Sequence, residues 1–416
     1  MLGPWRVGGF RWYWMASSTQ SVAQGMQFLV LGWLVLELTG SSIQQLGLVV
    51  FLYGIPNTAM LPFGGVIADR LNRKLLLAAT QAGVGALIGV VALLSLVDAI
   101  ALWHIYLAVA LLGILQALNQ PARVTMLSDL VGHGTLLDAV AQFNAAVHIG
   151  RIIGPPLVGI LIDGPPLIAE SFNVWGIGTG LIANAAFYGA SVFCLFPIHW
   201  TSSAAPPARE PLLQNFVNGL SVIKNTPVLL TVIVLACSFG GFGMSHLQVI
   251  PAFAKDQLGS DATQAGLMLL ASGVGSLAGN IALTFMNRAW LYRWLLACLV
   301  TMALVLALFG WSTSFWVAWA LFLVVGIVSL GTVWPLATTI LQLQCPAEVR
   351  GRVMGILHFT PGFHYLGALP LSFIAAETGW ALAITMAAGL MLLVTFWFGV
   401  GRNAGRELAA RPAAIG

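Results

Sequence analysis

Long apolar runs, separated by short polar or glycine- and proline-containing breaks, follow one another along the whole chain. A helix needs about 20 consecutive apolar residues to cross a bilayer, and the runs have this length. The pattern therefore predicts an all-α membrane protein with twelve transmembrane helices. The predicted spans are residues 16–38, 46–68, 75–97, 101–121, 139–162, 176–197, 227–250, 264–286, 290–310, 314–341, 352–375 and 379–400.

The composition excludes a soluble globular protein. Of 416 residues, 59% are hydrophobic and only 7% are charged, whereas a soluble chain carries about 25% charged residues. The sequence contains no GxxxxGK[ST] nucleotide loop and no HExxH metal pair, and its four cysteines lack metal-ligand spacing. We therefore expect no enzymatic activity, no metal, no cofactor and no nucleic-acid partner.

The basic residues predict the orientation in the membrane. With the N-terminus inside, fifteen of the seventeen lysines and arginines fall on the inner side, Arg123 among them. Lys255 falls outside, and Arg151 is the only base predicted within a span. Because cytoplasmic loops carry an excess of Lys and Arg, we expect both termini to be cytoplasmic, in a bacterial-type inner (plasma) membrane.

The spans divide into two halves. Residues 201–211, TSSAAPPAREP, form a polar linker between a six-helix bundle at 1–200 and a second bundle with a short tail at 227–416. Within the connecting region 201–226, LLQNFVNGLSVIKN has an apolar face and predicts either an amphipathic helix on the membrane surface or an extension of the next span. Two proline pairs recur 214 residues apart, Pro121 with Pro335 and Pro156 with Pro370, and indicate a parallel repeat.

A cluster of charges lies between spans two and three, in GGVIADRLNRKLLL. One interpretation is an ordinary inward-facing basic loop. The other is a conformational latch, in which Asp69 faces a helix N-terminus or an arginine, and nearby bases pair with it and with lipid headgroups. Gly64 and Gly65 would let a neighbouring helix approach closely. The latch residues are Gly65, Asp69, Arg70, Arg73 and Lys74.

This motif resembles the signature of the major facilitator superfamily, and the resemblance covers essentially the whole chain. It implies that helices 1, 4, 7 and 10 line a central cavity. One position departs, because Asn72 stands where the pattern usually has Gly; we expect Asn to support a left-handed backbone there. The corresponding turn of the second half, ending at Arg288, has no acid, so no matching second latch is expected.

Span five carries a glycine- and proline-rich pattern, GRIIGPPLVG. It resembles the antiporter motif of drug:proton exporters in this superfamily, at Gly150, Gly154, Pro155, Pro156 and Gly159. Glycines at helical spacing allow close packing and prolines bend a helix; a proline-kinked packing helix is the simpler interpretation. Four further stretches, LELTGSS, NQPAR, RIIGP and PAEVRGRVMG, resemble the branch that contains the enterobactin exporter and macrolide efflux proteins.

Polar residues in the cavity-lining spans are the candidate binding and coupling groups. Each could instead form a hydrogen bond between helices. The candidates are Gln20, Gln24, Gln27, Glu37, Gln116, Asn119, His148, Arg151, His246, Trp334 and Gln342.

No Asp or Glu lies in the middle of a predicted span, so proton coupling rests mainly on the resemblance, with histidines as titratable groups. Arg151 shares a helical face with Asn144 and His148. A charge near the membrane centre needs partners, so Arg151 serves either a structural network within the first bundle or a direct role towards an anionic substrate or proton carrier. Glu37 is the nearest acid in the same half.

We therefore predict a secondary transporter that exports small amphipathic organic molecules, such as drugs, macrolides or siderophores, by proton antiport with alternating access. Its partners would be the substrate, protons and the bilayer, and we expect a monomer. An uncoupled facilitator or importer is the alternative transporter. A membrane receptor or channel is the alternative of another class.

Overall fold

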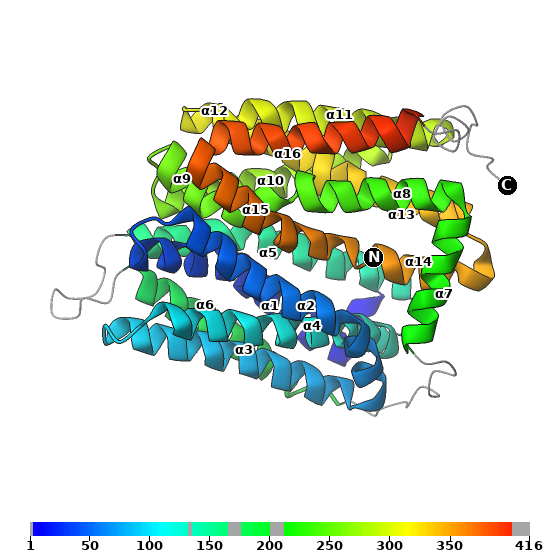
Figure 1. Cartoon of the computed structure of the whole chain (residues 1–416). Helices are drawn as coiled ribbons and strands as arrows, with labels where there is room; N and C mark the ends of the chain where they lie inside the picture. Colours follow the sequence, from blue (N-terminus) through cyan, green and yellow to red (C-terminus); the bar gives the residue numbers. More distant parts are fainter. Residues whose placement is uncertain (1–2, 132–134, 165–175, 200–211, 402–416) are drawn as a thin grey trace. The chain divides into compact units, whose positions relative to one another are not determined.

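The computed structural model describes residues 3–131, 135–164, 176–199 and 212–401, and its regular structure is helical throughout this part (Figure 1). Eleven helical stretches in the described ranges are long and apolar enough to cross a membrane. They are Gly8–Leu38, Ile43–Gly65, Arg73–Leu96, Leu102–Val131, Leu136–Asp163, Ile177–Leu195, Pro227–Gln257, Ala262–Leu283, Leu291–Gly310, Phe315–Gln344 and Trp380–Gly401. Each overlaps one of the predicted spans.

The remaining predicted span, 352–375, is divided in the structure. It corresponds to α14 (Ala347–Leu357), the 3-10 turn η6 (Thr360–Gly362) and α15 (Phe363–Thr378). The two α-helices have 11 and 16 residues, so each alone is shorter than a bilayer requires. The number twelve therefore stays a prediction.

The chain folds into two compact units. Unit 1 contains the chain up to Gln45, Leu52 to the end of α6, and Ala254–Leu270. Unit 2 contains Leu46–Phe51, the chain from α7 to Phe253, and everything described from Ala271 onward. The predicted linker 201–211 lies outside the described residues.

Unit 1 is built around α1. Its elements are η1 (Pro4–Arg6), α1 (Gly8–Leu38), α2 (Ile43–Arg70), α3 (Arg73–Leu96), α4 (Leu102–Val131), α5 (Leu136–Asp163) and α6 (Ile177–Leu195). α1 packs most extensively on α5 and α6, and α3 packs on α4 and α6. A buried apolar cluster that includes Phe10, Leu77, Met126 and Leu195 fills the space between these helices.

Unit 2 contains straight and interrupted helices. Its elements are α7 (Leu212–Asn225), α8 (Pro227–Ser238), the π-helical segment η2 (Phe239–Gly243), the 3-10 segment η3 (Ser245–Val249), α9 (Ile250–Gln257), α10 (Ala262–Leu283), η4 (Arg288–Trp290), α11 (Leu291–Gly310), α12 (Phe315–Val328), η5 (Ser329–Val333), α13 (Trp334–Gln344), α14, η6, α15, α16 (Trp380–Val394) and η7 (Thr395–Gly401). Unit 1 takes the end of α9 and the first part of α10.

The amphipathic segment after the linker is a separate helix. α7 ends at Asn225, and the extended backbone of Thr226 separates it from α8, so it is not an extension of the next span. It crosses the ends of α8 and α14 (Figure 1). The Phe216 ring lies 5.3 Å from that of Phe359, and a Cβ at Gly219 would come within 2.8 Å of the Ile356 side chain. Part of its apolar face therefore packs on protein.

Small residues bring α1 and α5 into backbone contact. A Cβ added at Gly150 would lie 2.5 Å from Cβ of Ser21, and one at Gly154 would lie 2.6 Å from the carbonyl oxygen of Val22. On the α1 side, a Cβ at Gly25 would lie 2.5 Å from the carbonyl oxygen of Gly150. These distances are too short for real Cβ atoms, so only glycine fits this seam.

The seam makes a prediction about stability. Gly154→Ala should destabilise the protein by about 1–3 kcal/mol, because the added methyl group forces two helix backbones apart. Thermal unfolding of the purified protein in detergent measures this loss.

Gly189→Ala in α6 is the matched control, since a Cβ there meets nothing within 4 Å. Equal melting temperatures for the two variants would show that the α1–α5 contact relaxes without cost.

Candidate functional site

The charged turn between α2 and α3 is tight and capped. α2 ends at Arg70 and α3 begins at Arg73. The Asn72 side chain accepts a hydrogen bond from the backbone N–H of Leu75, 3.2 Å away, and its φ is −62°. The expected left-handed backbone at Asn72 is therefore wrong: the residue is the N-cap of α3, a position that Asn favours through its side-chain oxygen.

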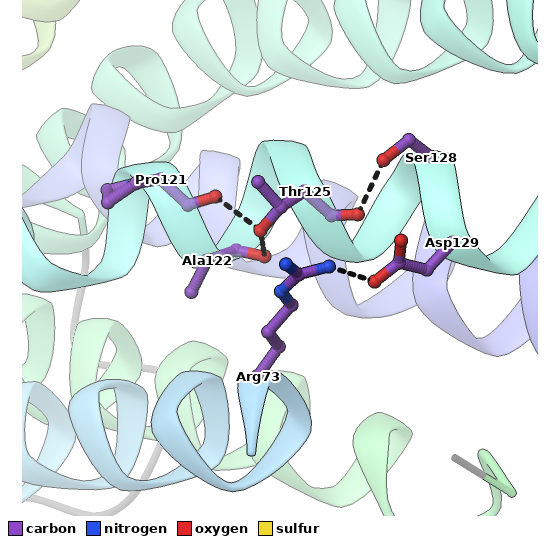
Figure 2. Close-up of polar contacts among 6 residues, drawn as sticks. All are labelled: Arg73, Pro121, Ala122, Thr125, Ser128 and Asp129. Atoms are coloured by element: carbon purple, nitrogen blue, oxygen red, sulfur yellow. Dashed lines mark hydrogen bonds and ion pairs between the residues drawn. The ribbon is translucent and has the colours of Figure 1, made fainter. Parts of the chain in front are cut away.

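Arg73, a latch residue, forms an ion pair that the sequence analysis did not identify. Its guanidinium donates to the Asp129 carboxylate near the end of α4 (Figure 2). The Arg73 and Asp129 side chains are only 10% and 23% exposed. The side chains of Asp69 and Arg70 lie outside the described part of the structure, so the role assigned to Asp69 stays a prediction.

Lys74 ties the same turn to α6. Its ammonium group donates to the backbone carbonyl oxygens of Phe196, at 3.0 Å, and Ile198, at 2.6 Å. Carbonyls at the end of a helix carry partial negative charge and favour a cation. The start of α3 is thus held to α4 through Arg73 and to α6 through Lys74.

Gly64, rather than Gly65, provides the close helix contact at this end of α2. A Cβ at Gly64 would lie 2.5 Å from the carbonyl oxygen of Ala117 in α4, whereas one at Gly65 would meet nothing within 4 Å. The expectation of close approach therefore holds at Gly64 and is wrong at Gly65.

The sequence did not point to Asp129, because α4 extends beyond the apolar run that predicted the span. The predicted span ends at residue 121, while the helix continues through Pro121 to Val131. In this extension the Thr125 hydroxyl donates to the carbonyl oxygen of Pro121, at 2.8 Å, and Ser128 donates to that of Thr125, also at 2.8 Å (Figure 2). These local bonds satisfy the hydroxyls within the helix, and Asp129 follows with its carboxylate directed at Arg73.

The glycines and prolines of the antiporter-like pattern lie in the interior of unit 1. α5 continues as a helix through Pro155 and Pro156, both of which are buried. Gly150 and Gly154 belong to the seam with α1. Further along, a Cβ at Gly159 would lie 2.5 Å from the carbonyl oxygen of Ala262 at the start of α10.

The candidate polar residues of α1 and α4 form a buried amide network. Gln20 donates to Asn119 at 2.6 Å, and Asn119 donates to the Thr80 hydroxyl at 2.8 Å. Gln81 donates to Gln20 at 2.8 Å and accepts a bond from the Ser191 hydroxyl at 2.6 Å. One chain of bonds thereby joins α1, α3, α4 and α6.

A second chain of bonds runs beside the first. Gln24 donates to Gln116 at 2.8 Å, and Gln116 donates to the Tyr188 hydroxyl at 3.0 Å. That hydroxyl donates to Gln27 at 2.8 Å. Gln20, Gln27, Gln116 and Asn119 are at most 4% exposed. These bonds are the alternative that the sequence left open for each candidate, a hydrogen bond between helices. Only Gln24 is partly exposed.

Arg123 is a buried cation that the sequence analysis counted among the bases on the inner side. The residue is 2% exposed inside unit 1. Its guanidinium donates to the Ser21 hydroxyl at 2.8 Å and lies 4.7 Å from the centre of the Phe143 ring. Its backbone carbonyl accepts a 2.5 Å bond from Tyr13. Arg151 is therefore not the only base within a span; the apolar run was too short to reveal Arg123.

Arg151 lies exposed on one face of α5. Helical spacing puts it on the face of His148, which is partly exposed, and of Pro155. It is close enough to His148 and Arg123 to act on both electrostatically. Glu37 is not its counter-charge, because its carboxylate pairs with Lys255 at 3.4 Å.

The unit 2 candidates occupy different environments. His246, in η3, is 3% exposed. Trp334 is half-buried, with its ring 6.1 Å from that of His358, and Gln342 is exposed on α13. Among the described contacts, no hydrogen bond joins any two of these three residues.

The comparisons with known proteins decide the family. The family model described as Major Facilitator Superfamily matches residues 13–363. The chain belongs to this superfamily. It is therefore a multi-pass membrane transporter rather than an enzyme.

Two relatives of this major facilitator chain are exporters by name. The multidrug efflux pump Tap of Mycolicibacterium fortuitum is 25% identical over 355 residues, covering 82% of this chain and 83% of the relative. The enterobactin exporter EntS of Shigella flexneri is 29% identical over 345 residues, covering 77% and 74%. The crystal structure of the nucleoside transporter NupG matches with a TM-score of 0.72 at 15% identity, covering 94% of this chain and 98% of that one, and supports the fold.

A double-mutant cycle tests the ion pair of this transporter. Arg73→Gln and Asp129→Asn should each lower stability, and together they should show a coupling of roughly 1–3 kcal/mol, between the values for exposed and buried pairs. Thermal unfolding in detergent gives the four values needed.

Lys74→Gln with Asp129→Asn is the control cycle, because Lys74 binds carbonyls of the α6 end and not the carboxylate. Coupling in the control cycle as large as that of Arg73 would mean that Asp129 acts through general electrostatics rather than through this contact.

Proposed function

We propose that this protein exports small amphipathic organic molecules in exchange for protons, by alternating access. In this proposal it acts as a monomer in a bacterial-type inner membrane, with both termini in the cytoplasm. It needs no cofactor other than the proton gradient. An uncoupled facilitator or importer remains the alternative outcome of the test below.

The α1–α5 seam is the observation that carries the proposal. A tightly coupled exporter must change conformation without letting protons leak, so helices beside the transport path have to pack without voids. Gly25 of α1 and Gly150 and Gly154 of α5 bring the two backbones into direct contact. Pro155 and Pro156 follow in the same helix and are buried. The two relatives named as exporters support the same direction of transport.

The arginines of α4 and α5 support an anionic group on the substrate. Among the described residues, the titratable groups that face Arg123 are Tyr13, Tyr188 and Arg151, and none is a carboxylate. Burying a cation without a neighbouring carboxylate costs free energy and leaves a positive electrostatic potential around it. Arg151 carries a second positive charge on an exposed face of α5, where an anionic group could reach its planar fork of donors.

Reconstitution into vesicles with an acidic interior tests the function. Transporters whose cytoplasmic side faces outward should move sulforhodamine B, an amphipathic anion, into the vesicle as protons leave it. Nigericin, which collapses the pH gradient, should abolish the accumulation. Movement of the dye down its own gradient, with no effect of pH, would instead identify a facilitator.

Arg151→Lys tests the substrate contact. A point charge replaces a planar fork, and a hydrogen bond to a charged group contributes about 1.5–3 kcal/mol. Accumulation of sulforhodamine B should therefore fall by about tenfold, whereas transport of rhodamine 6G, a cationic dye with the same ring system, should change by less than about twofold.

Arg350→Lys on α14 is the control, because this exposed arginine bonds only the Cys345 carbonyl among its described contacts. Equal loss of both dyes in Arg151→Lys would assign Arg151 to a structural network. Unchanged transport of both dyes would remove it from either role.

A further inference from the structure

The helix that begins with α8 changes its geometry twice before α9. α8 ends at Ser238, η2 (Phe239–Gly243) has the wide turns of a π-helix, and η3 (Ser245–Val249) has the tight turns of a 3-10 helix. π-helical turns inside longer helices occur frequently at functional sites. The sequence of η2, FGGFG, supplies the glycines that permit the change.

α15 packs directly against this irregular segment. A Cβ at Gly367 of α15 would clash with the carbonyl oxygen of Gly241, and one at Gly240 would lie 2.5 Å from the carbonyl oxygen of Thr360 in η6, just before α15. The two helical segments are in backbone contact, so any regularisation of η2 and η3 must move α15 as well.

His246 lies buried in η3 without a well-formed hydrogen bond. It is 3% exposed, and neither Nδ1 nor Nε2 meets a partner with hydrogen-bond geometry in the described structure; the backbone carbonyl of Gly243 is the polar backbone group that acts on the ring. Its ring lies 5.6 Å from that of Phe322 in an edge arrangement and 6.3 Å from that of Phe309. Phe309 stacks on Phe253 at 4.4 Å, which in turn contacts Trp380.

Packing alone does not explain an imidazole at this position. The surrounding cluster is aromatic, and a phenyl ring would make the same contacts without leaving polar atoms unpaired. An unsatisfied buried polar group costs about 1–3 kcal/mol. On the other side of η2, the Ser238 hydroxyl is also buried without a partner. The interrupted helix thus holds two polar groups that this conformation does not satisfy.

The imidazole can carry a proton only if its surroundings change. The polar groups that face it are the Gly243 carbonyl and His364 of α15. The ring contacts from α11 and α12 are the phenyl rings of Phe309 and Phe322. No carboxylate among the described residues offsets an imidazolium there. A charged ring would need water, and opening of η2 and η3 is the local movement that would admit it.

We propose that His246 is the proton-carrying group of the transport cycle, and that it takes up its proton only when the η2–η3 segment opens. The proposal rests on the proposed proton antiport and names the residue that performs it. Conformation and protonation are then coupled, because the closed segment holds the neutral ring and the open segment holds the charged one. Histidine titrates in the range where a cell membrane gradient operates.

Transport in vesicles tests this role with sulforhodamine B as the probe. In His246→Phe, which fills the aromatic cluster, and in His246→Gln, accumulation driven by an acidic interior should fall by about tenfold. Exchange of labelled for unlabelled dye at equal pH needs no proton cycle and should persist. His199→Phe, at an exposed position, should retain both activities. Full gradient-driven accumulation in either His246 variant overturns the proposal.

A second measurement requires no substrate. Cys237, in the last turn of α8, is half-buried, and its reaction with a thiol reagent reports opening of the segment. The other three cysteines, 194, 298 and 345, are buried and are replaced by alanine in the protein used for labelling. The measured quantity is the rate at which N-ethylmaleimide labels Cys237 in the wild type, divided by the rate in His246→Phe at the same pH. This ratio should rise about fivefold or more when the pH is lowered from about 8 to about 5. The ratio cancels the effect of pH on the thiol itself.

The two measurements separate the proposals. A constant labelling ratio overturns the role of His246 even if antiport is found. A rising ratio in a protein that shows no gradient-driven transport supports the protonation-linked opening and rejects the proposed antiport instead.

Discussion

A bilayer offers no water to polar groups within its core, so polar groups inside unit 1 are stabilised by partners in the protein. This constraint explains why the amides of α1 and α4 turn inward. The bonds from Gln20 to Asn119 and from Gln24 to Gln116 join helices that apolar contact with lipid would not hold together. These amides are therefore occupied in holding the helices of unit 1 together.

Close packing and fixed charge complete this arrangement. Glycines let the backbones of α1 and α5 meet, while the Arg73–Asp129 pair and the Lys74 bonds hold the start of α3 to its neighbours. The glycines set how closely α1 and α5 approach each other. The ion pair and the lysine bonds fix the start of α3 against α4 and the end of α6.

Unit 2 is organised differently, because its helices depart from regular geometry. The π-helical segments η2 and η5 interrupt spans that the apolar pattern predicts as continuous. Gly279 and Gly331 allow a close contact between α10 and η5, where a Cβ at Gly331 would lie 2.9 Å from Cα of Gly279. The π-helical turn of η5 therefore coincides with a place where two backbones meet.

The sequence by itself determined the membrane class, the positions of eleven spans, the superfamily and the glycines that pack α5, because lipid imposes length and hydrophobicity on each helix separately. It did not predict the ion pair of Asp129 or the burial of Arg123, since α4 continues past its apolar run and both residues lie in that continuation. Nor could it show that Gly64 and not Gly65 makes the close helix contact, or that Gln20 is hydrogen-bonded while the His246 ring lacks a well-formed hydrogen bond. Those differences arise from which side chains meet across helices, and only the tertiary structure decides that.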